Sequence, residues 1–419
     1  MTQKKYTESV SIVHPVCCGL DIHKRIIVAC LIDQSQDEAV MEIKQFGTFT
    51  NELLLLKEWL LEHACPVVAM ESTGVYWRPV HNILEGYMQV VLINARHYKN
   101  VPGRKTDVAD SQWIAELLRH GLLRGSFIPD PEVRRWRELV TMRNHFVSTE
   151  SDFRRRIQKL FETANIKIDS VVSDLFGVSG RNLMNLILSV PTEEITREDV
   201  RKCLRGRLNK KGEELFLAIQ GFVTDHHRFM LSEYLEVVDS CRHSVNHIES
   251  RIMEVMSPHQ DVLDRLQELP GISQIAAAGI LARLSPCLDA FPNSAALCSW
   301  AGVCPGNNES GGKRHSGRSP VHKHPLKTLL VEVAWAAIKT KGSYYRDKYY
   351  RLKARRGAKR AIVAIAHKLL KAIYVIIKEG KRYQELGSDY LDGRNKQAQI
   401  FRLKKMAEKY GFTVVENVA

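Results

Sequence analysis

The stretch VCCGLDIHKRIIVACLI, residues 16–32, decides the fold of the first part of the chain. Two apolar runs, residues 16–22 and 26–32, are separated by the polar residues HKR. Each run is short and rich in Val, Ile and Cys, which is typical of buried strands, and the short connection predicts a hairpin. Asp21 lies inside the first run, where an unpaired carboxylate is costly. It therefore needs either an ion pair with nearby Lys24 or a bound cation.

The segments after this hairpin predict an α/β layer. Their apolar spacing indicates a strand over residues 41–49, a helix over 51–64, a strand over 66–71, a helix over 77–87 and a strand over 89–95. A further helix begins near Asp107. Three strands followed by alternating helices and strands are typical of a mixed sheet covered by helices.

The rest of the chain predicts helices. Near-heptad apolar spacing from Trp136 to Leu160 and from Leu231 to Val255 predicts two long helices that pair as an antiparallel coiled-coil arm. A Gly- and Lys-rich stretch, RGRLNKKGEE, lies between them. After residue 261 come a helix, a Pro-Gly turn and more helices with broad apolar faces. The tail beyond about Gly387 is polar, and we expect it to be loosely ordered.

The composition favours a nucleic-acid partner. Lys and Arg number 61 against 47 Asp and Glu, and this net charge of +14 favours a polyanion. No apolar run approaches the ~18 residues of a membrane span. The first residues also lack an apolar signal core, so we expect neither a membrane protein nor an exported one. The nine cysteines form no C-x-x-C pair, which favours small apolar thiols in a reducing cytoplasm.

Four acids could form a metal site. Glu71 ends an apolar run, and ligands bind at strand ends in open α/β sheets, although a surface acid at a turn fits as well. Asp107 and Asp110 open a helix, where acids also complement the helix dipole after an N-cap at Thr106. They share one helix face. With Asp21 they would offer only carboxylate oxygens, which Mg²⁺ or Mn²⁺ prefers, and paired ions catalyse phosphodiester chemistry.

Two sequence blocks resemble one known family. GLDIHK, AMESTGVY and KTDVADS, in that order, are similar to the DEDD signature of the transposases of the "one-hundred-ten" insertion-sequence family, which includes the pilin-gene inverting recombinase. LPGISQIAAAGILARL and FPNSAALCSWAGVCPGNNESGGKRHSGRSP resemble the transposase domain of that family. The resemblance covers roughly residues 15 to 130 and 262 to 380. It leaves the middle of the chain unmatched.

The resemblance implies a fold class and a domain order. The fold class is α/β plus all-α, with an RNase H-like, RuvC-like N-terminal domain, a long helical arm and a helical transposase domain. The expected parts are a tail over residues 1–14, the RuvC-like domain over 15–132, the arm with its coiled-coil pair over 133–260, the transposase domain over 261–386 and a polar tail over 387–419.

The resemblance also implies an activity. The four acids of the family fall on Asp21, Glu71, Asp107 and Asp110, as ligands of Mg²⁺ or Mn²⁺, and its nucleophilic serine falls on Ser310. The enzyme would cut and rejoin DNA through a covalent protein–DNA link, with a bridge RNA that pairs with donor and target DNA. The family further implies a homo-oligomer, dimer or tetramer, in which the acids of one subunit meet the serine of another. A bacterial cytoplasm, at the nucleoid, is the implied location.

The residues around Ser310 suit such chemistry. A serine hydroxyl is a weak nucleophile until it is deprotonated or polarised. Gly311 and Gly312 let the backbone approach DNA closely, and Lys313 and Arg314 could neutralise charge on the phosphate. A flexible surface loop would carry the same residues.

The chain departs from the family pattern near this loop. Ser316 and Ser319 are nearby alternatives to Ser310, and only the family position favours Ser310. Glu309 stands where a second serine often precedes the two glycines. Lys327 stands where the family has an arginine, whose bidentate geometry a lysine does not match.

Two further segments suggest contacts with nucleic acid. LPGIS resembles a helix-hairpin-helix turn, in which the N–H groups of Ile272 and Ser273 would hold a phosphate, although a plain αα-corner is as good an interpretation. The segment from Lys341 to Lys368 is basic and holds four tyrosines that could stack on bases. Its expected phosphate contacts are Arg351, Lys353, Arg355, Arg356, Lys359 and Arg360.

Other functions stay open at this point. A metal-dependent nuclease or junction resolvase would use water in place of Ser310, and a relic of the fold would bind nucleic acid without catalysis. Cys241, His243 and His247 suggest zinc, but they lack a clear fourth ligand, so we do not expect it.

Overall fold

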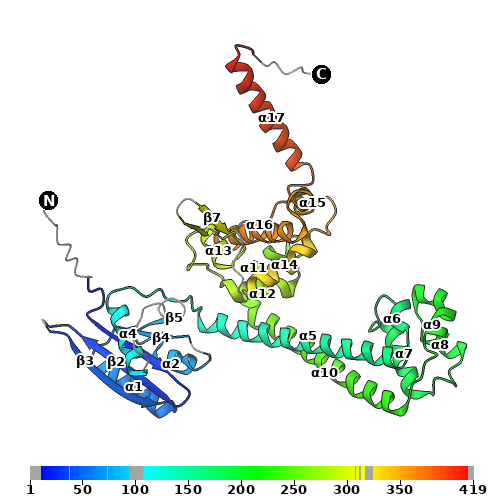
Figure 1. Ribbon diagram of the computed structural model, residues 1–419, viewed down its shortest axis with the longest axis horizontal. Coiled ribbons are helices and arrows are strands. Elements are labelled where there is room, and N and C mark those ends of the chain that lie inside the picture. The colour runs from blue at the N-terminus through cyan, green and yellow to red at the C-terminus, as the bar shows by residue number, and fades with distance from the viewer. Residues whose placement is uncertain are drawn as a thin grey trace. The chain divides into compact units, whose positions relative to one another are not determined.

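The computed structural model (Figure 1) describes residues 11–36, 38–72, 74–94, 107–306, 308–310, 313–316 and 324–413. The side chains of residues 107, 108, 308–310, 313–316 and 394–399 lie outside this description. The chain divides into two compact units, Met1–Ile128 and Pro129–Ala419. The finer division into five parts stays a prediction.

The first unit is built on a mixed five-stranded sheet. Its strands are β1 (Val16–Ile22), β2 (Ile26–Asp33), β3 (Val40–Gly47), β4 (Val67–Glu71) and β5 (Gln89–Ile93), in the order β3-β2-β1-β4-β5. β1 pairs antiparallel with β2, and β2 with β3, whereas β1, β4 and β5 run parallel. The predicted hairpin and mixed sheet are confirmed. This topology fits the expected RNase H-like fold.

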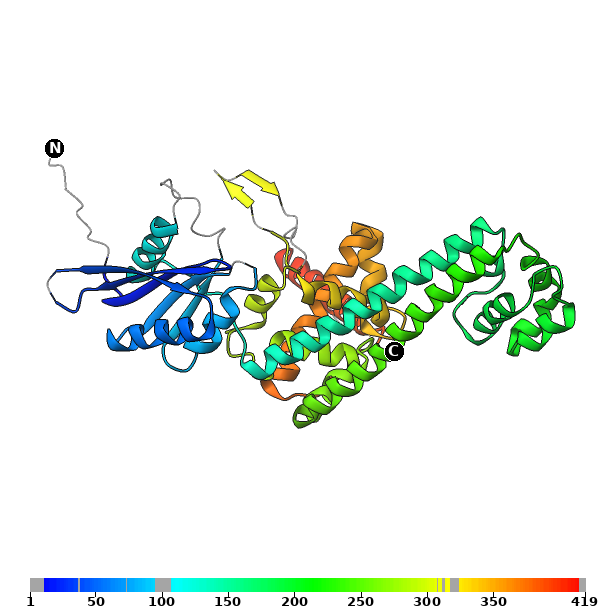
Figure 2. The ribbon, with the colours of Figure 1, turned by 90° about the horizontal axis from the view of Figure 1, so that it is seen from below.

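Helices cover both faces of the sheet. Helices α1 (Thr50–Glu62) and α2 (Trp77–Leu84) lie on one face, and α4 (Asp107–Arg119) lies on the other (Figure 2). The alternation of β1 explains this arrangement, because successive residues of a strand point to opposite faces. Cys18 and Leu20 join the apolar cluster under α1 and α2, whereas Cys17 joins the cluster under α4.

The cysteines act as small apolar residues. All nine are free thiols, and those in the first unit lie in its core. Burial raises the pKa of Cys17 to about 12 and the pKa values of Cys30 and Cys65 to about 11. These thiols are therefore neutral at pH 7, as the sequence predicts.

The second unit begins with a long helix pair. Helix α5 (Pro131–Thr163) packs along α10 (Asp225–Met256), as Figures 1 and 2 both show. Arg143 contacts Glu249 at 2.6 Å, and Glu150 contacts Arg242 at 3.4 Å. Residue numbers fall along α10 as they rise along α5, so the helices are antiparallel. The helix pair is confirmed, while its coiled-coil supercoil stays a prediction.

Short helical pieces between the two long helices form a knob at the end of the arm. We use "knob" for residues 164–224, which include α6 (Ile168–Val171), α7 (Val178–Ser189), α8 (Arg197–Cys203), the 3₁₀ helix η1 (Gly206–Lys211) and α9 (Gly212–Ala218). Their apolar residues share one core with the adjoining ends of α5 and α10. The knob is thus a packed part of the second unit.

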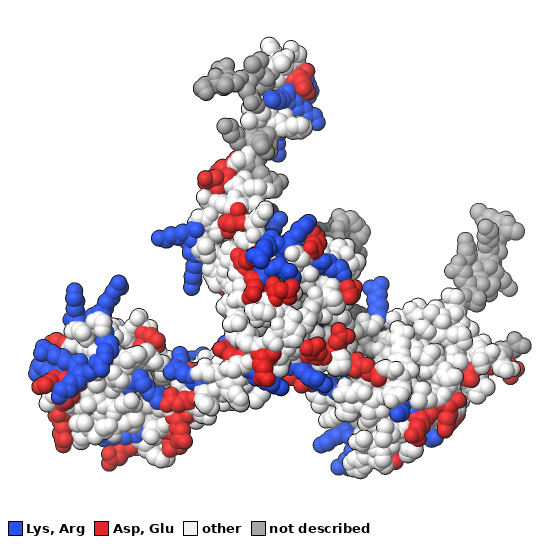
Figure 3. Space-filling model, turned by 180° about the vertical axis from the view of Figure 1, so that it is seen from behind, with Lys and Arg blue, Asp and Glu red and all other residues white. Residues whose placement is uncertain are grey.

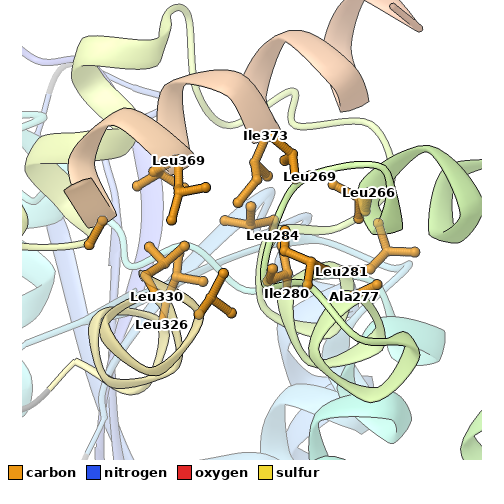
Figure 4. Close-up of a cluster of buried hydrophobic side chains, with 14 of the residues drawn as sticks. Leu266, Leu269, Ala277, Ile280, Leu281, Leu284, Leu326, Leu330, Leu369 and Ile373 are labelled. Carbon is orange, nitrogen blue, oxygen red and sulfur yellow. The ribbon is translucent and has the colours of Figure 1, made fainter. Parts of the chain in front are cut away.

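The remaining helices form a second core in this unit. They are α11 (Gln260–Gln267), after the 3₁₀ turn η2 (Ser257–His259), then α12 (Gln274–Leu284), α13 (Ser294–Trp300), α14 (Pro325–Ala337), α15 (Tyr344–Arg356) and α16 (Ala358–Glu379). Figure 4 shows leucines of α11, α12, α14 and α16 pointing toward one another. The predicted helices of this region are confirmed. No helix among the described residues is long and apolar enough to cross a membrane.

Two expectations about irregular segments were wrong. The loop around Ser310 contains a hairpin of β6 (Asn308–Ser310) and β7 (Lys313–Ser316). A two-residue Gly-Gly connection is a hairpin signal that the interpretation as a loop overlooked. The polar tail contains helix α17 (Tyr390–Lys409), which is rich in helix-forming Lys, Gln, Ala and Leu. Its first turn is held to α15 by Asp392, 2.7 Å from Arg351.

Candidate active site

Two of the predicted ligands lie at the carboxyl ends of neighbouring parallel strands. Leu20 of β1 is paired in register with Met70 of β4, so the next positions, Asp21 and Glu71, lie side by side at the carboxyl ends of these strands. Asp21 is buried and Glu71 is half-buried. Residues two apart in a strand share a face. Asp21 therefore shares the α4 face of the sheet with Cys17.

Helix α4 runs antiparallel to β1 on that face. The N–H of His14 donates to the carbonyl of Arg119 at 3.0 Å, and Sγ of Cys17 lies 3.6 Å from the carbonyl oxygen of Ala115. As residue numbers rise along β1, the contacting residues of α4 therefore lie closer to the beginning of that helix. Two strand residues advance about 6.6 Å and four helix residues about 6 Å, so the first turn of α4 comes level with Asp21.

Gly19 allows α4 to lie this close. A Cβ atom at this position would be 2.3 Å from the carbonyl oxygen of Ser111 and 2.5 Å from the backbone nitrogen of Ala115. Both are backbone atoms, so no side-chain rotation could relieve the overlap. Ser111 itself is fully buried against the sheet, and it directly follows Asp110. The glycine thus sets the distance between the first turn of α4 and β1.

The acids of α4 occupy its first turn, as the sequence predicts. Asp107 is the first residue of the helix, and its side chain lies outside the described residues. Asp110 is half-buried. The expected N-cap, Thr106, also lies outside the described residues. Among the side chains that are described, no three His, Cys, Asp or Glu residues form a metal-binding group.

The donor chemistry nevertheless fits a hard divalent cation. Asp21 and Glu71 offer carboxylate oxygens at one sheet edge, and the helix turn with Asp107 and Asp110 begins at that edge. Oxygen ligands of this kind suit Mg²⁺ or Mn²⁺ and suit zinc or copper poorly. The full set of four ligands stays a prediction.

His23 belongs to this edge as well, and the sequence reasoning missed it. Its Nε2 lies 3.0 Å from Oδ2 of Asp21, and a carboxylate oxygen only accepts, so Nε2–H donates. The His23 backbone N–H donates to the carbonyl of Ile26 at 2.9 Å and closes the hairpin turn. The partner shown for Asp21 is thus His23, where the sequence suggested Lys24. The spacing of two residues, between an acid near the end of β1 and a histidine just after it, was the available signal.

The predicted nucleophile lies in the second unit. Ser310 ends β6 and pairs with Lys313 of β7 through the backbone. The side chains of Ser310, Lys313, Arg314 and Ser316 lie outside the described residues, as do residues 311, 312 and 319 entirely. Lys327 lies in the first turn of α14 and is half-buried.

The LPGIS turn packs against protein. The N–H of Ile272 donates to the carbonyl of Leu269 at 3.2 Å, so it already has a partner within the protein. The expected phosphate contact at this turn stays a prediction. The Ser273 hydroxyl caps α12 by accepting from the Ala276 N–H at 3.3 Å. A Cβ at Gly271, whose φ is +83°, would lie 2.5 Å from the nitrogen of Ala337 in α14. These contacts favour the αα-corner.

In the basic segment from Lys341 to Lys368, one of the six expected phosphate contacts is paired with acids and the other five are exposed. Arg351 is bound by two carboxylates, Asp347 at 2.8 Å and Asp392 at 2.7 Å, so it is not a simple phosphate contact. The other five expected contacts are exposed around the turn between α15 and α16. We call this surface the basic corner: Lys353, Arg355, Arg356, Lys359 and Arg360.

The expected stacking by four tyrosines is largely wrong. Tyr345 and Tyr349 are buried in the helical core, and Tyr344 packs edge-on against Tyr390 with ring centres 5.8 Å apart. Only Tyr350, among these four, is well exposed. Amphipathic helices bury one face, and the run of tyrosines spans both faces of α15.

Two models of known protein families match parts of this chain. A family model described as a transposase, of the DEDD type of the IS110 group, matches residues 18–166. A second, described as the transposase IS116/IS110/IS902 family, matches residues 263–351. The two matches support the IS110 transposase family. They also support a general activity, the cutting and rejoining of DNA, and they support DNA as a partner. The four acids lie in the first matched range and Ser310 lies in the second.

The other comparisons add little. The chain is similar to a structure titled "Thermus thermophilus RuvC structure", with 13% identity and a TM-score of 0.21 over 26% of this chain and 99% of that one. It is also similar to "T. thermophilus RuvC in complex with Holliday junction substrate", with 14% identity and a TM-score of 0.21 over 27% of this chain and 100% of that one. With TM-scores this low, we draw nothing from either structure. The comparison with curated proteins gives no match.

Proposed function

We propose that this IS110 transposase performs DNA strand transfer through a serine nucleophile and a four-carboxylate metal site. Asp21, Glu71, Asp107 and Asp110 would hold Mg²⁺ or Mn²⁺, and Ser310 would attack the DNA. The observation that carries the proposal is the placement of Asp21 and Glu71 on the sheet face where α4 begins.

Each residue has a defined role in the proposed reaction. A divalent cation held by the four carboxylates would stabilise negative charge on the scissile phosphate and the leaving oxygen. Oγ of Ser310 loses its proton and forms an ester bond to phosphorus. The phosphorus–oxygen bond to the neighbouring deoxyribose breaks, and the leaving oxygen takes up a proton. Rejoining is the reverse attack by a deoxyribose hydroxyl, so the energy of the phosphodiester bond is kept in the protein–DNA ester.

His23 and the basic residues would support this reaction. The Nε2–H of His23 binds one oxygen of Asp21 and so orients the carboxylate toward its ligand position. Lys313, Arg314 and Lys327 would lie near the attacked phosphate. The basic corner would hold the phosphate backbone of donor and target DNA and of a structured bridge RNA. We propose a homo-oligomer that joins the acids of one subunit to the serine of another, in the bacterial cytoplasm at the nucleoid.

Trapping of the covalent link tests the proposal. The full-length protein is incubated with element-end DNA and Mg²⁺, denatured, and separated by electrophoresis. We expect labelled DNA to stay attached to wild-type protein and to Ser316→Ala, and to be released from Ser310→Ala. Cleaved but unattached DNA in every sample would identify a nuclease that uses water. No cleavage and no loss of element mobility in Asp21→Asn would identify a non-catalytic relic.

The guide has its own test. RNA that co-purifies with the expressed protein is extracted and sequenced. We expect one structured RNA from the non-coding end of the element, and random cellular RNA would contradict guidance.

A further inference from the structure

The knob carries a dense run of cations. RKCLRGRLNKK, residues 201–211, holds six Lys or Arg in eleven residues and no acid. It covers the end of α8 and all of η1. This run lies in residues 167–262, which neither matched family range includes. The proposed strand transfer makes no use of it.

All six cations are exposed, and the backbone that carries them is anchored to the packed core of the knob. Val200 and Leu204 are buried in the knob core, and they anchor α8 and the start of the run. We call the exposed set the knob ridge: Arg201, Lys202, Arg205, Arg207, Lys210 and Lys211. In Figure 3, Lys and Arg side chains gather over the knob, at the left of the view.

Four of the six cations of the knob ridge form no ion pair among the described residues. Lys202 lies 3.6 Å from Glu198, and Lys211 lies 3.9 Å from Glu214. Arg201, Arg205, Arg207 and Lys210 have no carboxylate within ion-pair distance among the described residues. Arg201 is nevertheless close enough to Glu213 to help lower the pKa of that carboxyl. The alternative explanation is that these cations are only solvated and complement the dipole at the end of a helix. That effect reaches only the last turn of α8. It explains Arg201 and leaves the η1 cations unexplained.

We propose that the knob ridge binds the phosphate backbone of duplex DNA. Exposed cations at this density, most of them without an ion-pair partner, are the electrostatic footprint of a polyanion site. Residues 197–211 contain no Phe, Tyr or Trp, so the ridge lacks the stacking groups with which proteins hold single-stranded bases. Backbone contacts alone suit a duplex and give affinity without sequence readout. The inference needs neither the metal ligands nor Ser310, so it goes beyond the proposed function.

The test compares two charge-matched variants of the full chain. The first replaces Arg201, Arg207 and Lys210 by Gln. The second replaces three exposed cations on the outer side of α5, Arg155, Arg156 and Lys159, by Gln. Both variants lose the same net charge, so a difference between them reports local contacts. Binding of a short blunt DNA duplex is measured between about 50 and 200 mM salt, in an Asp21→Asn background that prevents cleavage.

The expected effect is a change of salt dependence. If each ridge cation contacts one phosphate, the slope of log affinity against log salt falls by about 3 × 0.9 = 2.7. Over a fourfold change of salt, wild type then loses about 40-fold more affinity than the ridge variant. We expect the α5 variant to keep nearly the wild-type slope. If the triple variant unfolds, the three single ridge substitutions replace it in the measurement. Each of them is expected to lower the slope by about 0.9.

Three results would overturn the inference. Equal slopes for the two triple variants would leave the ridge as a solvated surface. A changed slope for a structured RNA hairpin without a change for the duplex would assign the ridge to RNA. An altered oligomer mass in light scattering with an unchanged slope would assign it to a second protein surface.

Discussion

Replacing Gly19 by Ala should disable the acid cluster while leaving the fold largely in place. The new Cβ would lie 2.3 Å from the carbonyl oxygen of Ser111, whereas ordinary contact begins at 3.4 Å. Helix α4 must therefore move by about 3.4 − 2.3 = 1.1 Å. Overpacking of this kind costs about 1–3 kcal/mol of unfolding free energy. A misplacement of about 1 Å in a catalytic group costs about 100-fold in rate.

The assay combines stability, metal binding and cleavage. We expect Gly19→Ala to unfold at lower denaturant concentration, to bind Mn²⁺ more weakly and to cut DNA about 100-fold more slowly. Gly125→Ala is the matched control in the same unit, because its Cβ would meet only a side-chain methyl at the ordinary distance of 3.4 Å. Wild-type Mn²⁺ affinity and cleavage in Gly19→Ala would refute the reasoning that this glycine positions α4.

Three other predictions concern hydrogen bonds and burial. His23→Ala should weaken Mn²⁺ binding by about 10–100-fold in calorimetry, and His23→Gln, which keeps a donor, should restore most of it; equal affinities for both would exclude an orienting role. Arg137→Met should lower the unfolding free energy by about 1.5–3 kcal/mol in urea, because Arg137 donates to two carbonyls at the end of α12, at 2.8 and 2.7 Å. Burial raises the pKa values of Cys30 and Cys65 from 9.0 to about 11, so the stabilisation by the protonated thiols is complete below pH 9 and is lost as pH rises through 11. Between these two pH values each thiol lowers the free energy of unfolding by up to about 1.4 kcal/mol per pH unit. Cys65→Val should remove the contribution of Cys65 from this pH dependence.

The sequence predicted those features of the fold that depend on local periodicity. The hairpin of β1 and β2 follows from two short apolar runs, and the long helices follow from their apolar spacing. The acid positions could be placed at a strand end and a helix start for the same reason. Local pattern also placed Asp21 in a strand, because a single acid does not break an apolar run.

The sequence did not predict features that depend on tertiary contacts. The closeness of α4 and β1 depends on Gly19, and a lone glycine in a strand does not reveal which helix will lie on it. The burial of Tyr345 and Tyr349 depends on which face of α15 meets the core. Arg351 was expected to meet phosphate, but its second partner, Asp392, comes from a helix that the polar tail concealed.

Direct measurement of Mn²⁺ binding tests the central claim most sharply. Calorimetry on the full chain should show a Mn²⁺ site in wild type that weakens by more than about 100-fold in Asp107→Asn and in Asp110→Asn, since a lost ligand exceeds the effect of a lost outer partner. Asp225→Asn, at the exposed start of α10, is the control and should bind as wild type does. Unchanged Mn²⁺ affinity in the Asp107 and Asp110 variants would contradict a carboxylate site at the start of α4.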